Sequence, residues 1–124
     1  MPDEQSTPTI NLAVVRGAAS APPELRQLPS GRRLATFSVR THALGPPATS
    51  VPVAAWDPPA WLETVDEGDE LIVAGSVRRR FYRSVTGSLA SRVELEAAVV
   101  GRGSDPRKIR RARHLTEEAL EALG

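Results

Sequence analysis

The sequence contains no cysteine, so disulfide bonds, thiolate metal sites and cysteine nucleophiles are excluded. Its two histidines, His42 and His114, lie far apart, and neither stands in a ligand-like spacing. Catalytic motifs are missing too: there is no Gly-x-Ser-x-Gly elbow, no phosphate-cradling Gly-x-x-x-x-Gly-Lys and no dinucleotide fingerprint. We therefore expect no metal site and no cofactor, and we predict a protein that is not an enzyme.

Long hydrophobic runs are also missing. No apolar stretch approaches the roughly 18 residues of a membrane-spanning helix. The first residues lack the basic-then-apolar pattern of a signal peptide. We therefore expect no membrane partner and a cytoplasmic location. The length of 124 residues suits a single domain with one modest core.

Lysine is almost absent, and Lys108 is the single exception among the 16 basic residues. The arginines gather at residues 78–83 and 102–113, while the net charge is only +1. The planar guanidinium suits phosphate groups and stacks on bases. Biased codon use also favours arginine over lysine, so this composition alone does not decide the function.

Alternation of apolar and polar residues predicts five main strands, at residues 10–16, 34–41, 51–56, 71–77 and 89–100. A shorter stretch at residues 24–28 precedes a turn, and residues 85–88 form a hairpin tip. In the last strand we expect inward and outward residues to alternate. The inward set is Val93, Leu95, Ala97 and Val99, and the outward set is Glu94 and Glu96.

One helix of two to three turns is predicted between the third and fourth main strands. Asp57 is placed to cap it, two prolines follow, and Gly68 stops it. This order is typical of a five-stranded oligonucleotide-binding (OB-fold) barrel, although short strands could also form a small sandwich. The predicted fold class is therefore mainly β: an OB-fold barrel with one helix between strands 3 and 4, plus a short C-terminal helix.

The C-terminal segment is basic and then acidic. A continuous helix would place its arginines at the positive end of the dipole and its glutamates at the negative end. A restart at Thr116, with Glu117 and Glu118 in the first turn, avoids both. The predicted organisation is a flexible N-terminus (1–8), an OB-fold domain (9–102), and a basic arm with a short helix (103–124). The arm is either an extra DNA contact or a linker.

Several segments, taken in order, resemble bacterial single-stranded DNA-binding proteins. Residues 23–31 and 34–41 resemble the family's opening strands, which often read DPEVRYTPSG and AVANFSLAT. Residues 67–78 resemble its KGSQVYVEGRLR segment, and Val93-Glu94-Leu95 resembles its closing TTEI strand. The likeness covers roughly residues 10–101. It implies an OB fold, a homotetramer or homodimer, and a nucleoid-associated protein that acts in DNA replication, repair or recombination.

The resemblance also implies how DNA is bound: bases stack on aromatic side chains, and arginines contact phosphates without reading sequence. Trp56 and Tyr82 fall at two of the family's four aromatic positions. The other two positions, near His42 and at residues 50–53, are not aromatic. The chain resembles a short paralogue without the acidic C-terminal tip, so recruitment of replication or repair proteins through such a tip is not expected.

The candidate DNA-binding residues combine the two aromatics with nearby arginines. They are Arg16, Arg33, Arg40, Trp56, Arg78, Arg80, Tyr82 and Arg83. Trp56 either stacks on a base or closes the end of the barrel. Tyr82 shares a strand face with Arg78 and Arg80, which forms either a binding patch or a solvated hairpin. The alternatives are a primosome-type OB-fold dimer and an OB-fold protein-interaction module with weak or no DNA binding.

Overall fold

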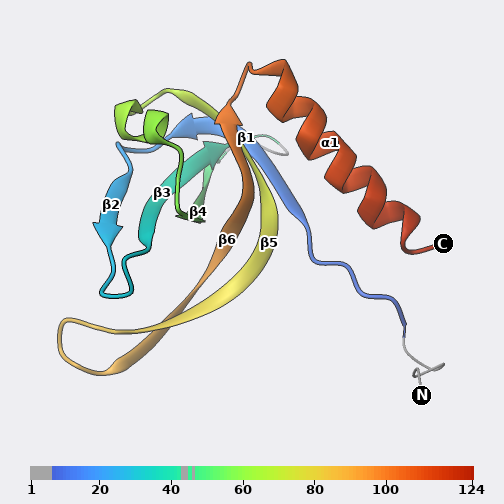
Figure 1. Cartoon of the computed structure of the whole chain (residues 1–124). Coiled ribbons are helices and arrows are strands. Elements are labelled where there is room, and N and C mark those ends of the chain that lie inside the picture. The colour runs from blue at the N-terminus through green and yellow to red at the C-terminus, as the bar shows by residue number, and fades with distance from the viewer. Residues whose placement is uncertain (1–6, 43–44, 46) are drawn as a thin grey trace.

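The computed structural model describes residues 7–42, 45 and 47–124. The predicted flexible N-terminus and the connection between the strands predicted at residues 34–41 and 51–56 therefore lie partly outside the described residues. The described chain is mainly β, with one α-helix at its C-terminal end (Figure 1). The strands are β1 (Ala13–Ala19), β2 (Glu24–Gln27), β3 (Arg33–Thr41), β4 (Thr49–Trp56), β5 (Glu70–Arg83) and β6 (Leu89–Arg102). The helices are a 3-10 helix, η1 (Ala60–Thr64), and α1 (Pro106–Glu121).

Five of the six strands close into a ring. The sheet order is β1-β5-β6-β4-β3-β2, and β1 pairs with β3 as well as with β5. The pairing between β4 and β6 is parallel and short, joining Val53 to Leu95 and Ala54 to Glu96. The short strand β2 lies outside the ring and pairs only with β3. The predicted mainly β fold with five principal strands is confirmed at this level.

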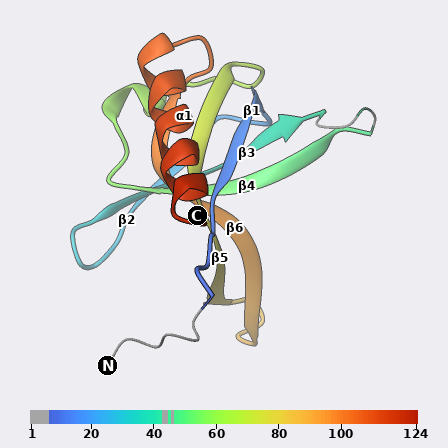
Figure 2. The ribbon, with the colours of Figure 1, turned by 90° about the vertical axis from the view of Figure 1, so that its right-hand side faces the viewer.

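Apolar side chains from alternate strand positions fill the ring. Phe37 and Val39 of β3, Val53 of β4, Leu71 of β5 and Leu95 of β6 are all buried in one cluster. A second cluster lies outside the ring, where α1 packs across β5 and β6 (Figure 2). Its members are Ile72, Ala74, Val99 and Ala112, with Ile109 and Leu115 packed against them. The helix therefore has a fixed place on the outer face of the sheet.

The alternation predicted for β6 breaks at a bulge. Ala74 pairs with Val99, whereas Gly75 pairs with Ala97, so Ala98 has no partner on β5. One extra residue reverses the faces of everything beyond it. Val99 consequently packs under α1 rather than inside the ring, and its predicted orientation is wrong. Val93 is also exposed, because it lies on a hairpin that extends beyond the ring.

The helix predicted after β4 is a single 3-10 turn. η1 begins at Ala60 after Pro59, without a side-chain cap. The prediction that Asp57 caps it is wrong, because Asp57 adopts a positive φ of 48° and turns its carboxylate toward β3. Leu62 and Val65 bury their side chains in the ring core, which fixes this short helix against the ring.

The C-terminal helix is continuous, and the predicted restart at Thr116 is wrong. Asp105 caps α1 by accepting a hydrogen bond from the Arg107 amide at 3.0 Å. Thr116 lies inside the helix and donates its hydroxyl to the Ala112 carbonyl at 2.9 Å. Burial of Ala112 and its neighbours against the sheet outweighs the unfavourable charge order along the dipole. Within the described residues, no helix is long and apolar enough to cross a membrane.

Candidate nucleic-acid interface

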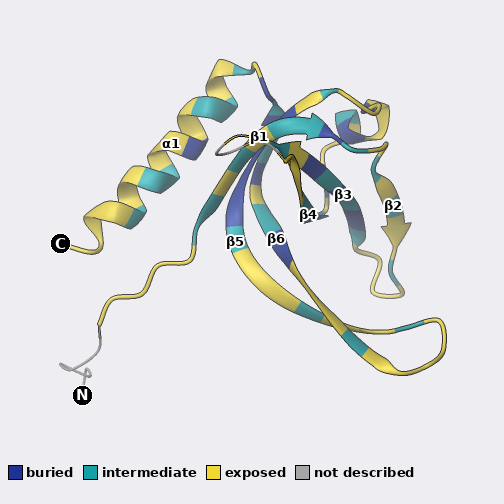
Figure 3. Cartoon of the chain, turned by 180° about the vertical axis from the view of Figure 1, so that it is seen from behind, coloured by how far each residue is buried: buried dark blue, intermediate teal, exposed yellow. Residues whose placement is uncertain are grey.

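The strands β5 and β6 continue beyond the ring as an exposed hairpin (Figure 3). Directly opposite residues share a face, and the register pairs Arg80 with Arg92 and Tyr82 with Ala90. Arg78 lies two positions before Arg80 and therefore points the same way. The structure thus places Arg78, Arg80 and Tyr82 on one face, as the alternation predicts.

Carboxylates of the adjacent strand hold the arginines of this face. The Arg80 Nε lies 2.6 Å from a carboxylate oxygen of Glu94, whose side chain is only 4% exposed. The Arg78 Nε lies 2.5 Å from Glu96. Glu94 was expected to face solvent, but it is buried, and Arg92 approaches it as well. A phosphate that reaches these arginines therefore has to compete with carboxylates already in place.

Trp56 ends β4 on the outer face of the ring, where it meets the turn before β3. The guanidinium carbon of Arg32 lies 4.6 Å from the centre of the Trp56 ring. Two nitrogens of Arg32 lie 3.0 and 3.1 Å from one carboxylate oxygen of Asp57. This hydrogen bond, helped by the backbone N–H of Arg33, holds the pKa of Asp57 below its ordinary value of 3.8. One side of the indole therefore carries a fixed cation.

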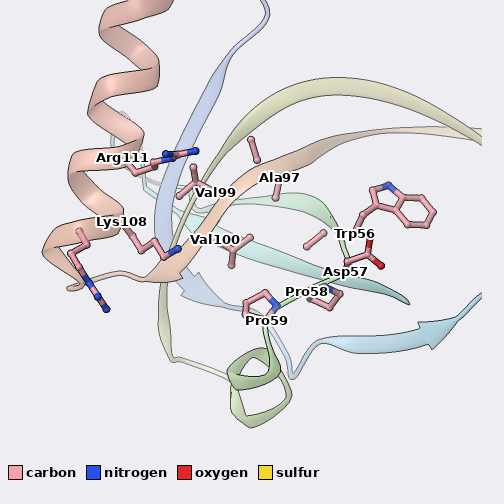
Figure 4. Close-up of a pocket in the computed structure, with 12 residues that line it drawn as sticks. Trp56, Asp57, Pro58, Pro59, Ala97, Val99, Val100, Lys108 and Arg111 are labelled. Atoms are coloured by element: carbon pink, nitrogen blue, oxygen red, sulfur yellow. The ribbon is translucent and has the colours of Figure 1, made fainter. Parts of the chain in front are cut away.

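Two hollows meet at Trp56. The first, of about 380 Å³, leads toward the hairpin and is bordered by Arg78, Arg80 and Glu94. The second, of about 660 Å³, lies between the end of β4, β6 and α1 (Figure 4). Lys108 and Arg111 reach into it from the helix, and Trp56 stands at its opposite end (Figure 4). Trp56 borders both hollows, and we refer to the two together as the groove.

The remaining predicted arginines lie elsewhere. Arg16 pairs with Glu70 at 2.9 Å and donates to the Gly103 carbonyl at 2.8 Å, which ties β1 to β5 and to the segment before α1. Arg33 pairs with Glu63 of η1. Neither borders the two hollows at Trp56.

Arg40 and Arg83 lie apart from this hairpin face, because Arg83 is the register partner of Leu89 and points to the opposite side from Tyr82. Arg40 is exposed on β3, and its register partner is Ser50 of β4. It shares the outer face with Trp56 but lies at the far end of the strand pair. Arg83 donates to the Gly87 carbonyl at 3.2 Å within the hairpin turn. The structure therefore brings together Trp56, Arg78 and Arg80, with Tyr82 further along the hairpin face.

Three spatial relationships within this surface were not predicted from the sequence. Arg32 lies beside Trp56 only because the turn before β3 folds back to β4, and no periodic pattern indicates that contact. Glu94 was recognised as part of a strand, but its burial was not. The basic run of α1 was noticed, whereas its place opposite Trp56 depends on tertiary packing.

Within residues 7–42, 45 and 47–124, no three His, Cys, Asp or Glu side chains come together as metal ligands. The candidate surface combines the indole of Trp56 and several guanidinium groups along the groove with the phenol of Tyr82 further out on the same hairpin face. Such a surface can bind a chain of bases and phosphates.

Comparisons with known proteins show a likeness of fold. No protein-family model matches the sequence, and no curated protein matches it. Among solved structures, the chain is similar to a deletion mutant of the single-stranded DNA binding protein from Thermus aquaticus. The TM-score is 0.63 and the sequence identity is 21%. The match covers 77% of this chain but 42% of the other, so this chain spans less than half the length of that protein.

Proposed function

We propose that this protein binds single-stranded DNA without sequence preference. Bases stack on Trp56 and Tyr82, and the guanidinium groups of Arg78 and Arg80 contact phosphates. The observation that carries the proposal is the groove at Trp56, which joins this indole to the arginine face of the hairpin. The fold is similar to that of a protein named as a single-stranded DNA binder, which agrees with the same assignment.

Neither base stacking nor phosphate contact depends on the sequence of the DNA. Every base offers a π-face, and stacking on an aromatic side chain contributes about 1–3 kcal/mol per base. Arginine–phosphate contacts release counterions, which makes binding weaker as salt rises. Glu94 and Glu96 oppose a phosphate on the hairpin face, so we expect lower affinity than from an unpaired arginine face.

The other four predicted arginines have smaller roles in DNA binding. Arg40 and Arg83 provide outlying contacts, whereas Arg16 and Arg33 contribute only if they exchange their carboxylate partners for phosphates. The protein acts as a homodimer or homotetramer on DNA exposed during replication, repair or recombination. It works in the cytoplasm at the nucleoid, and no catalytic step is assigned to it.

Fluorescence gives a direct test. In a Trp61→Phe variant, Trp56 is the single tryptophan, so oligo(dT) that stacks there should quench the emission, and added salt should reverse the quenching. Trp56→Leu and Tyr82→Leu should each weaken binding about 5- to 150-fold, the equivalent of 1–3 kcal/mol. Trp61→Phe alone should bind like the wild type, because Trp61 packs on the ring core and against Arg102.

A second candidate function is supported by the opposite face of the hairpin. Phe81, Leu89 and Val93 are 63%, 66% and 46% exposed there, which suits contact with another protein. A binding experiment with oligo(dT) distinguishes the two functions. If low salt gives neither quenching nor a mobility shift with oligo(dT), DNA binding is contradicted and the protein-interaction module is favoured.

A further inference from the structure

The groove does not end at Trp56 but continues along the first two turns of α1. We infer that these turns form a second phosphate-binding wall, so that a single strand of DNA leaving Trp56 runs between β6 and α1. This inference rests on the proposed function and extends its binding site to Arg107, Lys108 and Arg111. All three residues border the same hollow of about 660 Å³.

The cations of this wall are more available than those of the hairpin. Among the described residues, no Asp or Glu oxygen lies within the 4.0 Å ion-pair distance of Lys108 or Arg111. Arg107 lies 3.7 Å from Asp105 and its side chain is 82% exposed. Asp57 also borders the groove, but its carboxylate is bound to Arg32. A phosphate here has no strong intramolecular partner to displace.

The wall is also held in a fixed position. Ala112 is buried against Ile72, Ala74 and Val99, which anchors the middle of α1 to the sheet. The aliphatic stem of Lys108 packs directly over Gly101 of β6, where a side chain would collide with it. Cations carried on a rigid element lose less conformational freedom on binding than cations on a loose arm.

The floor of the groove suits a nucleic acid better than a free anion. It is formed by small apolar side chains of β6, including Ala97 and Val100, between the helix cations and the indole of Trp56 (Figure 4). Cations along one side and an aromatic group at the end match a backbone of phosphates that carries stacked bases. An isolated phosphate would use only the cations.

The helix offers its own matched control. Arg110 and Arg113 belong to the same turns and are exposed, but they do not border the groove. The double variants Arg107→Gln/Arg111→Gln and Arg110→Gln/Arg113→Gln each remove two positive charges from one helix. Any effect of net charge alone is therefore common to both, and a difference between them reports position.

The test measures binding of full-length protein to a labelled oligo(dT) of about 16 nucleotides, the upper limit for one such fold. Each phosphate contact contributes about 0.7 to the salt slope for single strands. Arg107→Gln/Arg111→Gln should lower the slope by about 1.4, so the ratio of wild-type to variant affinity should be about 25-fold larger at ~0.1 M salt than at ~1 M salt. The Arg110→Gln/Arg113→Gln slope should stay close to that of the wild type.

The outcomes separate the inference from the function on which it rests. Equal slopes in the two double variants would overturn the helix wall, while loss of binding in Trp56→Leu would still support the proposed function. If the groove-side variant weakens binding but Trp56→Leu does not, the helix wall stands and stacking at Trp56 is wrong. If the wild type binds no oligo(dT) at low salt, both are overturned. Circular dichroism should show that both variants remain folded.

Discussion

Arg32 lies over Trp56, with its guanidinium carbon 4.6 Å from the ring centre, and Asp57 holds it there through two contacts of 3.0 and 3.1 Å. Three side chains thus connect the turn before β3 to the end of β4. Asp57 adopts a φ of 48°, which a residue other than glycine rarely does, to present its carboxylate to Arg32 and to the Arg33 amide. Trp56 is therefore presented in one orientation, with one face shielded by a cation.

Acidification should release this arrangement. The hydrogen bond from Arg32 lowers the pKa of Asp57 below 3.8, so its stabilising contribution is present above the unfolded pKa and is lost as pH falls through the lower folded value. We expect the emission of Trp56 in the Trp61→Phe variant to change in that acidic window. Carboxyl NMR titration of Asp57 measures the pKa directly.

Arg32→Gln is the informative variant for this titration. Without the guanidinium, the pKa of Asp57 should move back up toward its ordinary value, because the largest cause of its depression is gone. Arg26→Gln is a suitable control, because Arg26 is an exposed arginine of β2 that makes no contact with Asp57. An unchanged pKa in Arg32→Gln would show that the ion pair does not form in solution.

Removal of a carboxylate from the hairpin face should strengthen DNA binding. Glu96 lies 2.5 Å from Arg78, and Glu96→Gln frees this arginine for a phosphate. Arg78 is exposed and Glu96 is partly buried, so stability should change by no more than about 1 kcal/mol, and affinity should rise up to about fivefold, the equivalent of ~1 kcal/mol. Anisotropy with labelled oligo(dT) at low salt measures the gain. Glu67→Gln removes the same charge far along the chain, from the exposed loop after η1, and should give no comparable increase.

The start of α1 can be tested with two alanine substitutions. Asp105→Ala should lower the free energy of unfolding by about 1 kcal/mol, because Asp105 accepts the Arg107 amide as the helix cap. Thr116→Ala should be neutral or slightly stabilising, by less than about 0.5 kcal/mol, since Thr116 lies mid-helix and alanine has the higher helix propensity. Urea unfolding measures both. If Thr116→Ala instead lowers the free energy of unfolding by about 1 kcal/mol, Thr116 acts as a helix cap and the helix is not continuous.

Most of the strands could be predicted from the sequence, but the places where the regular pattern breaks could not. A period-two pattern correctly predicted β3, which has one face in the core, whereas β5 was predicted from a continuous apolar run, because its first half is buried on both faces. The bulge at Ala98, the 3-10 turn and the continuity of α1 depend on packing between distant segments, which a local pattern does not contain. The wrong prediction at Thr116 is an example. Burial of Ala112 against the sheet stabilises the continuous helix more than the charge order along its dipole destabilises it.

The candidate site was predictable only in part, for the same reason. The shared face of Arg78, Arg80 and Tyr82 follows from alternation within one strand. The partners of those arginines, the cation over Trp56 and the helix cations across the groove come from other elements. Sequence reasoning therefore finds the residues of a site along one strand, while its groove requires the tertiary structure.

Two glycines receive the same added methyl group with different expected results. At Gly17, alanine would collide with the backbone carbonyl oxygen of Arg40, where β1 and β3 close the ring. Gly17→Ala should therefore cost at least about 3 kcal/mol in urea unfolding. At Gly101, alanine would collide with the first side-chain carbons of Lys108, so α1 has to shift away from the sheet. Gly101→Ala should therefore cost about 1–3 kcal/mol, less than Gly17→Ala.

The two glycine variants also separate ring closure from helix docking. Because Gly101 contacts α1 through Lys108, Gly101→Ala should lower the amide-exchange protection of α1 while the strands keep theirs. It should also weaken oligo(dT) binding if the helix wall takes part. Gly17→Ala should instead lower the protection of the ring strands. Equal loss of protection in ring and helix in both variants would mean that they unfold as one unit, and that α1 has no independent docking equilibrium.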